Sequence, residues 1–224
     1  MPKKVICITG GANGLGRELA AFFSRQSQVV IFDIDKKILE TVAKKFDCDY
    51  QLCNVSNYHA VSASIKNVFK KYHRIDCFIN SAGVYIDGEI ESNDPDLIKK
   101  VYEINSIGPV FTTQVLVPIL KKQKFGTIIN INSTASLHPK AFNSVYHSSK
   151  WALKGFSESI QPELSSFGIK VVNICPGVMK TKFTDGTNTD LSKAMEPHQV
   201  VKAIDFILSL DSDTVITELT IKHL

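Results

Sequence analysis

The amino-acid sequence predicts a single α/β domain in which a parallel, doubly wound sheet of about seven strands carries helices on both faces. Short runs of β-branched residues alternate along the chain with stretches of helical periodicity. Most of these runs are almost continuously apolar, which is typical of strands buried on both faces of a parallel sheet. No internal repeat, low-complexity tract or Pro/Gly-rich linker interrupts the alternation, so we expect residues 1–224 to form one domain.

The predicted strands are VICIT (5–9), VVIFD (29–33), YQLCNV (50–55), DCFIN (76–80), TIININ (127–132), KVVNIC (170–175) and VITELTI (215–221). Amphipathic stripes predict the first three helices, through Leu15, Leu19, Phe22 and Phe23, through Ile38, Leu39, Val42, Ala43 and Phe46, and through Val61, Ile65, Val68, Phe69 and Tyr72. Further helical segments are expected over 101–120, 146–164 and 196–210. Right-handed crossovers bring the carboxyl ends of such strands to one edge of the sheet, where doubly wound folds bind ligands.

The composition argues against several functional classes. Hydrophobic residues make up 44% of the chain, charged residues 21%, and the net charge of +4 is spread over scattered lysine pairs, so no nucleic-acid surface is indicated. No apolar run approaches the roughly 20 residues of a membrane span, and none after MPKK suits a signal peptide. The five cysteines and six histidines show no disulfide framework or metal-ligand spacing. We therefore expect reduced thiols, no metal site and a cytoplasmic location.

The segment TGGANGLG, from Thr9 to Gly16, lies directly between the first predicted strand and the first predicted helix. Gly10, Gly14 and Gly16 allow a tight turn, close backbone approach and close helix–strand packing. The free N–H groups at the helix start would then face a diphosphate, which the helix dipole favours. The spacing is GxxxGxG, not the usual GxGxxG, but its position predicts a dinucleotide-binding loop.

A carboxylate, Asp33, ends the second predicted strand, at about the 20-residue distance from the first glycine expected of the acid that binds the adenosine ribose. Such a carboxylate accepts hydrogen bonds from both ribose hydroxyls and repels a 2′-phosphate. The alternative role is a helix N-cap, which Asp35 could fill equally well. Asn13 in the glycine loop is uncharged, whereas Lys36 and Lys37 could swing toward a phosphate. We expect NAD(H) as the preferred cofactor, with NADP(H) as the alternative.

The segment VYHSSK (145–150) places Tyr146 and Lys150 one helical turn apart on the same face. By itself this pattern also fits a Tyr–Lys pair on a solvated helix. Other segments accompany it in the same chain, in the order TGGANGLG, NSAG (80–83), Asn105, Ser133, Tyr146, Lys150 and PGVMKT (176–181). Together they resemble the short-chain dehydrogenase/reductase family over essentially the whole chain. The resemblance implies a Rossmann-type fold and hydride transfer between NAD(P) and a secondary alcohol or ketone.

The resemblance also implies roles for the four catalytic candidates. Tyr146 would exchange a proton with the substrate oxygen, while Lys150 would lower the pKa of its phenol and bind the nicotinamide ribose. Ser133 would donate a hydrogen bond to the substrate oxygen, although it could simply cap a strand end. Asn105 would hold a water that relays protons to Lys150. A polar residue before a Gly-Pro pair could instead merely cap or kink the helix.

The cofactor is expected to contact the strand ends through Gly10, Asn13, Gly14, Leu15, Gly16, Asp33, Asn54, Val55, Asn80, Ala82, Gly83, Tyr146, Lys150, Pro176, Gly177, Val178 and Thr181. Thr181 and the backbone of Val178 would hold the nicotinamide carboxamide, although Thr181 could instead start the next helix. Two positions depart from the family pattern. Asn54 replaces the usual aspartate that faces the adenine, but its amide oxygen can accept the same hydrogen bond. Ser81 replaces the usual second asparagine.

Three loops, 84–94, 134–144 and 182–196, are expected to contact the substrate, and the last is polar enough to form a mobile lid. The candidate pocket residues are Ser133, Leu137, His138, Phe142, Met179 and Phe183. His138 could instead face solvent, and His147 is expected to point away from the site. Because these walls are apolar with few charges, we expect an uncharged secondary alcohol or ketone of moderate size.

Two other functions stay open from the sequence. A dinucleotide-binding redox sensor performs no turnover, but it would not need Ser133, Tyr146 and Lys150 together. A nucleotide-sugar epimerase or dehydratase also uses YxxxK, but such relatives usually carry a longer substrate region. The segments 101–120 and 146–164 carry more apolar residues than one buried face requires, so we expect a homodimer or homotetramer.

Overall fold

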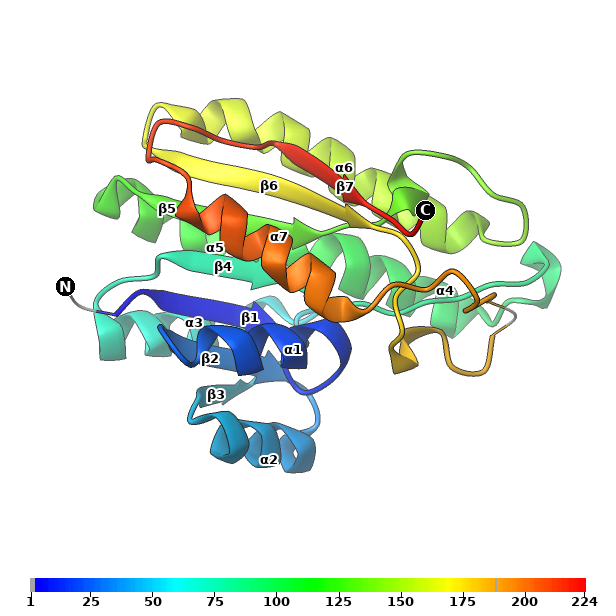
Figure 1. The fold of residues 1–224 in the computed structure, drawn as a ribbon, viewed down its shortest axis with the longest axis horizontal. Helices are drawn as coiled ribbons and strands as arrows, with labels where there is room; N and C mark the ends of the chain where they lie inside the picture. The colour runs from blue at the N-terminus through cyan, green and yellow to red at the C-terminus, as the bar shows by residue number, and fades with distance from the viewer. Residues whose placement is uncertain (1–2, 188) are drawn as a thin grey trace.

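The computed structural model describes residues 3–187 and 189–224 and confirms the predicted fold. Seven strands form one parallel sheet in the order β3-β2-β1-β4-β5-β6-β7 (Figure 1). The strands are β1 (Val5–Thr9), β2 (Gln28–Asp33), β3 (Asp49–Leu52), β4 (Cys77–Asn80), β5 (Gly126–Ile131), β6 (Ile169–Pro176) and β7 (Glu218–Ile221). Every predicted strand is present, although β3, β4 and β7 are shorter than the runs that predicted them.

The strand order reverses at β1. The chain runs outward from β1 through β2 to β3, and then returns to place β4 on the other side of β1. Thr9, at the end of β1, pairs in register with Phe32 of β2 and Asn80 of β4. The glycine loop after Thr9 and the NSAG turn that begins at Asn80 therefore leave the sheet next to each other, at the switch point where doubly wound sheets bind ligands.

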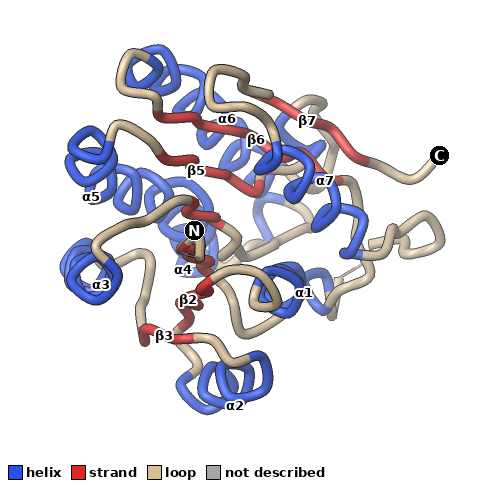
Figure 2. Tube along the Cα trace, turned by 60° about the vertical axis from the view of Figure 1, so that its left-hand side comes forward, coloured by secondary structure: helices blue, strands red, loops and turns tan. Residues whose placement is uncertain are grey.

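Helices cover both faces of the sheet (Figure 2). They are α1 (Gly14–Phe23), α2 (Lys36–Phe46), α3 (Tyr58–Tyr72), α4 (Pro95–Tyr102), α5 (Gly108–Gln123), α6 (Ser144–Ser165) and α7 (Pro197–Ser209). One core layer packs α1, α2 and α7 against the sheet through residues such as Leu19 and Ile204. The other packs α3, α5 and α6 through residues such as Ile65 and Leu116. Within the described residues, no helix combines the length and apolarity needed to cross a bilayer.

The helix predicted over 101–120 is interrupted. The π-helical turn η2 (Glu103–Ile107) separates α4 from α5. Pro109 has no N–H, so it cannot donate to the carbonyl of Asn105 four residues earlier, and we attribute the wider turn to this missing hydrogen bond. The interruption places Asn105 at a break in the helix, close to the loop that follows β4.

Candidate active site

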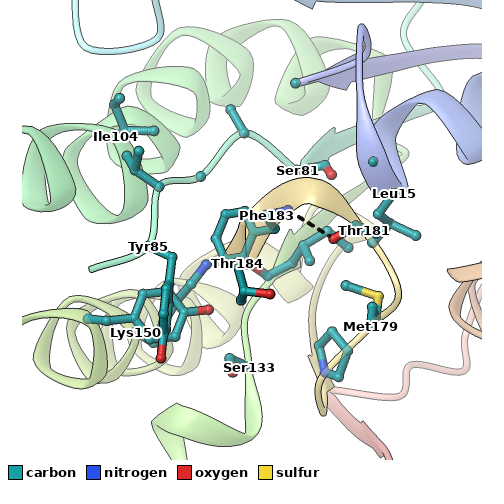
Figure 3. Close-up of a pocket in the computed structure, with 18 of the residues that line it drawn as sticks. Leu15, Ser81, Tyr85, Ile104, Ser133, Lys150, Met179, Thr181, Phe183 and Thr184 are labelled. Carbon is teal, nitrogen blue, oxygen red and sulfur yellow. Dashed lines mark hydrogen bonds between the residues drawn. The ribbon is translucent and has the colours of Figure 1, made fainter. Parts of the chain in front are cut away.

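A cavity of about 940 Å³ opens at the carboxyl edge of the sheet, over the switch point between β1 and β4 (Figure 3). Its size is at the upper end of ligand pockets, as a large ligand requires. Most of the predicted cofactor-binding residues line it, namely Gly10, Asn13, Gly14, Leu15, Gly16, Asp33, Asn54, Val55, Ala82, Gly83, Tyr146, Lys150, Pro176, Gly177, Val178 and Thr181.

The glycine loop packs more tightly than any side chain would allow. Gly10 has a φ of +67°, and a Cβ there would lie 2.8 Å from the Cα of Ala82. A Cβ on Gly16 would lie 2.2 Å from the carbonyl oxygen of Gly10. At the start of α1, Asn13 makes no side-chain capping bond and the first turn contains no acid. The N–H groups at this helix start are therefore available to the cavity, which fits the diphosphate of a dinucleotide.

Asp33 ties β2 to the glycine loop. One oxygen of its carboxylate accepts the N–H of Ala12 at 3.1 Å, and the other accepts the N–H of Ile34 at 2.7 Å. Asp35, and not Asp33, caps α2 by accepting the N–H of Ile38 at 3.0 Å. The N–H of Asp35 also donates to the oxygen that accepts the Ile34 N–H, at 3.4 Å, so Asp33 lines the cavity with one acceptor site left, which fits a hydroxyl of an adenosine ribose.

Two predicted cofactor contacts also serve as local caps. The side-chain oxygen of Asn54 accepts both the N–H and the hydroxyl of Ser56, at 3.0 and 2.9 Å. Its amide NH₂ is therefore the group left for a ligand, and the acceptor role predicted for the oxygen competes with this turn. The hydroxyl of Thr181 accepts the N–H of Phe183 at 3.3 Å and caps the short helix η4 (Lys182–Thr184), which confirms its alternative role. Asn54 and Thr181 both still line the cavity.

Thr9 is a supporting residue that sequence reasoning missed. Its hydroxyl accepts the N–H groups of Ser81 and Ala82, at 3.0 and 3.1 Å, and so fixes the turn after β4. The available signal was a hydroxyl residue at the end of β1, just before the glycine loop. Asn80, predicted to contact the cofactor, does not line the cavity. It is buried, and its side chain donates to Asn130 at 2.8 Å.

Tyr146 and Lys150 both reach the cavity from α6, one turn apart. The Nζ of Lys150 lies 5.8 Å from the centre of the Tyr146 ring and donates to the carbonyl oxygen of Ile131 at 2.9 Å. Ser133, just past β5, lies near enough to Tyr146 for its hydroxyl to act on the phenol and lower its pKa. That hydroxyl also accepts the N–H of Ala135 at 3.1 Å, so the alternative capping role is confirmed as well. The three polar groups therefore meet at one place.

Asn105 lies in η2 and is buried outside the cavity lining. Its side-chain oxygen accepts the N–H of Val84 at 2.8 Å, and its NH₂ donates to the carbonyl of Val84 at 2.8 Å and to Ser149 at 3.2 Å. The side chain therefore anchors the loop after β4 to α6. Because Pro109 cannot donate to the Asn105 carbonyl, that oxygen lacks its α-helical partner. The water relay to Lys150 stays a prediction.

Burial dominates the electrostatics of the Tyr–Lys pair. Tyr146 is 8% exposed, and desolvation raises the pKa of its phenol above the usual range, against the opposing effect of the Ser133 hydroxyl. Lys150 is 4% exposed, and burial lowers the pKa of its ammonium to about 8. The structure therefore does not show the predicted lowering of the Tyr146 pKa by Lys150. The free energy needed to bury a phenolate is larger than the stabilisation that the neighbouring groups give it.

Two aromatic side chains cover Tyr146. The ring centre of Tyr85 lies 4.8 Å from that of Tyr146, and the ring centre of Phe183 lies 6.1 Å from both. Figure 3 shows Tyr85 and Phe183 on the same side of the pocket as Lys150. The Tyr85 hydroxyl donates to the side chain of Asn143. The three loops predicted to bind substrate therefore meet over Tyr146. Sequence reasoning missed Tyr85, although it closely follows the NSAG turn.

The predicted substrate residues divide into two groups. Four line the cavity, and these are Ser133, His138, Met179 and Phe183. Leu137 and Phe142 do not line it, and the side chain of Phe142 is 63% exposed. Within the loop 182–196, position 188 lies outside the described residues, and Met195 returns toward the cavity by donating its N–H to the carbonyl of Val178 at 2.9 Å.

The cavity carries more charge than the sequence predicted. His147, predicted to point away, lines the cavity instead, because its Nδ1 bonds to the carbonyl oxygen of His138 at 2.9 Å and holds the ring against the loop 134–144. Lys100, Lys140 and Lys182 line the cavity too. The expectation of walls with few charges was therefore wrong.

Groups that could bind a metal are not clustered. Across residues 3–187 and 189–224, no three His, Cys, Asp or Glu side chains lie close enough together to hold an ion. All five cysteines are free thiols, and four of them are buried. Burial raises the pKa of Cys7 and Cys77, so these thiols stay protonated in the core.

The fold and the cavity define an α/β protein of the doubly wound, Rossmann class. The family model for short chain dehydrogenases matches residues 4–192, and the chain belongs to this family of oxidoreductases. An uncharacterized oxidoreductase of Staphylococcus epidermidis is 27% identical over 98% of this chain and 97% of its own length.

Solved structures share the fold. An alcohol dehydrogenase from Thermococcus sibiricus, complexed with 5-hydroxy-NADP, superposes with a TM-score of 0.91 at 21% identity, over 99% of this chain and 97% of that one. A 3-ketoacyl-(acyl-carrier-protein) reductase from Brucella melitensis, complexed with NADH, gives a TM-score of 0.91 at 23% identity, over 98% and 97%. These neighbours bind nucleotides of both the NADP and the NAD type.

Proposed function

We propose that this protein is an NAD(P)-dependent oxidoreductase that interconverts a secondary alcohol and a ketone, with Tyr146 as the general acid and base. The observation that carries the proposal is that Ser133, Tyr146 and Lys150 meet in the same cavity that the glycine loop enters. A nucleotide site and an acid–base site in one cavity are what hydride transfer coupled to proton transfer requires.

The chain's own residues handle the substrate oxygen and its proton. When bound, the nicotinamide supplies or accepts the hydride. Ser133 donates a hydrogen bond to the substrate oxygen and holds it beside Tyr146. In reduction the phenol of Tyr146 gives its proton to that oxygen, and in oxidation the phenolate takes it back. Because burial raises the pKa of Tyr146, the neutral phenol is favoured and the site is set up as a proton donor.

Lys150 supports this proton transfer. With a pKa of about 8, it is mostly an ammonium at neutral pH, so it stabilises a phenolate when one forms. One of its N–H groups is held by the carbonyl of Ile131, and the others are left for the nicotinamide ribose. The side chain of Asn105 anchors the loop after β4, and its backbone carbonyl would hold the water that renews the proton.

We propose NAD(H) as the preferred cofactor, bound by the residues of the glycine loop and by Asp33. A 2′-phosphate placed beside the Asp33 carboxylate would be repelled. Lys36, which could have offset this repulsion, lies 3.9 Å from Glu40 on the same helix. The negative charge of Asp33 at this end of the cavity therefore favours a cofactor whose adenosine ribose has two free hydroxyls, as NAD(H) has.

The test is turnover of a panel of ketones and secondary alcohols with NADH and NADPH. Removal of a general acid–base group typically costs about 10²–10⁴-fold in rate, so Tyr146→Phe should lose activity by that factor and keep its NADH affinity. Tyr58→Phe, on α3, is the matched control and should keep full activity. A Tyr146→Phe variant as active as the wild type would refute the proposal. Tight NADH binding without turnover of any substrate would favour the redox sensor.

We also propose that the enzyme acts on a small molecule in the cytoplasm, as a homodimer or homotetramer. The free thiols suit a reducing compartment. Ile107, the last residue of η2, is 40% exposed, and Trp151, on α6, is 49% exposed, as an apolar surface available for helix pairing would be. Light scattering during size-exclusion chromatography distinguishes these states from a monomer.

A further inference from the structure

One wall of the cavity, close to Tyr146, carries a lysine and two histidines. It is formed by His138 and Lys140 from the loop 134–144 and by His147 from the first turn of α6, and we call these three residues the cationic wall. The bond between Nδ1 of His147 and the carbonyl oxygen of His138 fixes the imidazole with its proton on Nδ1, so Nε2 is an acceptor in the neutral ring and donates to an anion only when the ring is protonated. Burial lowers the pKa of His147, and the nearby charge of Lys140 lowers it further.

The cavity lining contains little to balance this charge. Asp33 is the one acidic residue among the described lining residues, and it lies beside the glycine loop, where it binds the N–H of Ala12. Lys140 makes no ion pair with any carboxylate in the described part of the chain. Asp87, on the facing loop, acts electrostatically on Tyr85 but does not line the cavity.

The start of α6 adds to the positive potential. This 22-residue helix begins at Ser144, and its first turn contains no acidic residue. The Asn143 side chain does not cap the helix, because its oxygen accepts the Tyr85 hydroxyl instead. The positive end of the helix dipole is therefore not neutralised next to the cationic wall.

Apolar groups lie in the same part of the cavity. Ala135, Pro139, Tyr85 and Phe183 line it together with the cationic wall, and Tyr85 and Phe183 pack against Tyr146. A ligand that suits both surfaces has an apolar body and a charged end of negative sign. Such a ligand places its apolar part against these rings, where a carbonyl group can reach Ser133 and Tyr146.

We propose that the substrate carries an anionic group, a carboxylate or a phosphate ester, which the cationic wall binds while the carbonyl lies at Tyr146. This inference rests on the proposed oxidoreductase function and names its substrate class. It replaces the uncharged substrate expected from the sequence. Lys140 supplies the positive charge of the wall, since burial holds the imidazole of His147 toward its neutral form.

The experiment compares a medium-chain keto acid with its methyl ester in the holoenzyme with NADH. A charge-assisted hydrogen bond discriminates by roughly tenfold or more, so the wild type should show at least that preference in kcat/KM for the acid. Lys140→Met should lower this preference about tenfold, through KM and not kcat, and leave the ester unaffected. Lys66→Met, on α3 away from the cavity, is the matched control and should behave as the wild type. Calorimetry of both compounds with the NADH-loaded enzyme measures the same preference without turnover.

Each outcome decides the proposal. Equal kcat/KM and equal affinity for acid and ester would overturn it, as would a Lys140→Met variant that weakens both compounds alike. A preference for the acid that weakens as salt is added and that disappears in Lys140→Met supports it. If the wild type turns over the ester as well as the acid, in a reaction that Tyr146→Phe abolishes, the oxidoreductase function stands and the anionic site is refuted.

Discussion

Gly16→Ala tests whether tight packing of the glycine loop shapes the nucleotide site. The added Cβ would lie 2.2 Å from the carbonyl oxygen and 2.8 Å from the carbonyl carbon of Gly10. Carbon–oxygen contacts normally begin at about 3.3 Å, so the loop and α1 must separate by roughly 1 Å. Both contacted atoms are backbone, and no flexible side chain can absorb the shift. Overpacking of this kind costs about 1–3 kcal/mol, which lowers Tm by roughly 2–12 °C in a chain of this length.

The same shift moves the N–H groups of α1 away from the diphosphate position, so NADH affinity should fall roughly ten- to hundredfold. Thermal unfolding followed by circular dichroism gives the stability, and calorimetry gives the affinity. Gly155→Ala, inside α6, is the control, because a Cβ there meets no atom within 4 Å. Alanine at this helix position should stabilise the protein by about 1 kcal/mol. A Gly16→Ala variant that melts and binds NADH like the wild type would refute this account of the loop.

Three further predictions follow from the charges and burial in the cavity. Asp33→Asn keeps an oxygen for the N–H of Ala12 but removes the negative charge. The kcat/KM for NADPH, divided by the kcat/KM for NADH, should therefore rise at least tenfold. An unchanged ratio would contradict the proposal that the Asp33 carboxylate repels the 2′-phosphate. Phe183→Ala exposes Tyr146 to water, so the pKa of the phenol should fall toward its usual value. An ultraviolet titration measures this pKa, and the same titration of the Phe183→Ala/Tyr146→Phe double variant gives the signal of the other tyrosines. An unaltered titration would show that Phe183 does not desolvate the phenol. Lys150 has a folded-state pKa of about 8, below its unfolded value of about 10.4. Between these two pH values the unfolded state binds one more proton than the folded state. The free energy of unfolding of the wild type therefore increases as pH rises through this window. Relative to Lys150→Met, this gain should reach roughly 2–3 kcal/mol between pH 7 and pH 11 in urea unfolding, and a pH-independent difference would rule out the shifted pKa.

The amino-acid sequence determined the features that depend on residues near one another in the chain. Apolar runs and helical stripes gave the order of strands and helices, because periodicity is set within each element. The glycine loop was identifiable because its residues act through their own backbone, between one strand and one helix. Tyr146 and Lys150 could be placed on one face because both belong to the same helix.

The tertiary structure alone decided which side chains surround the reacting groups. The cover of Tyr146 by Tyr85 and Phe183 joins loops that lie far apart in the sequence, and it sets a burial that reverses the expected direction of the phenol's pKa shift. The same is true of Thr9, whose hydroxyl holds a turn at the end of another strand. Desolvation and charge act through space, so the pKa values and the charge of the cavity follow from the packing of distant segments, which no local sequence pattern records.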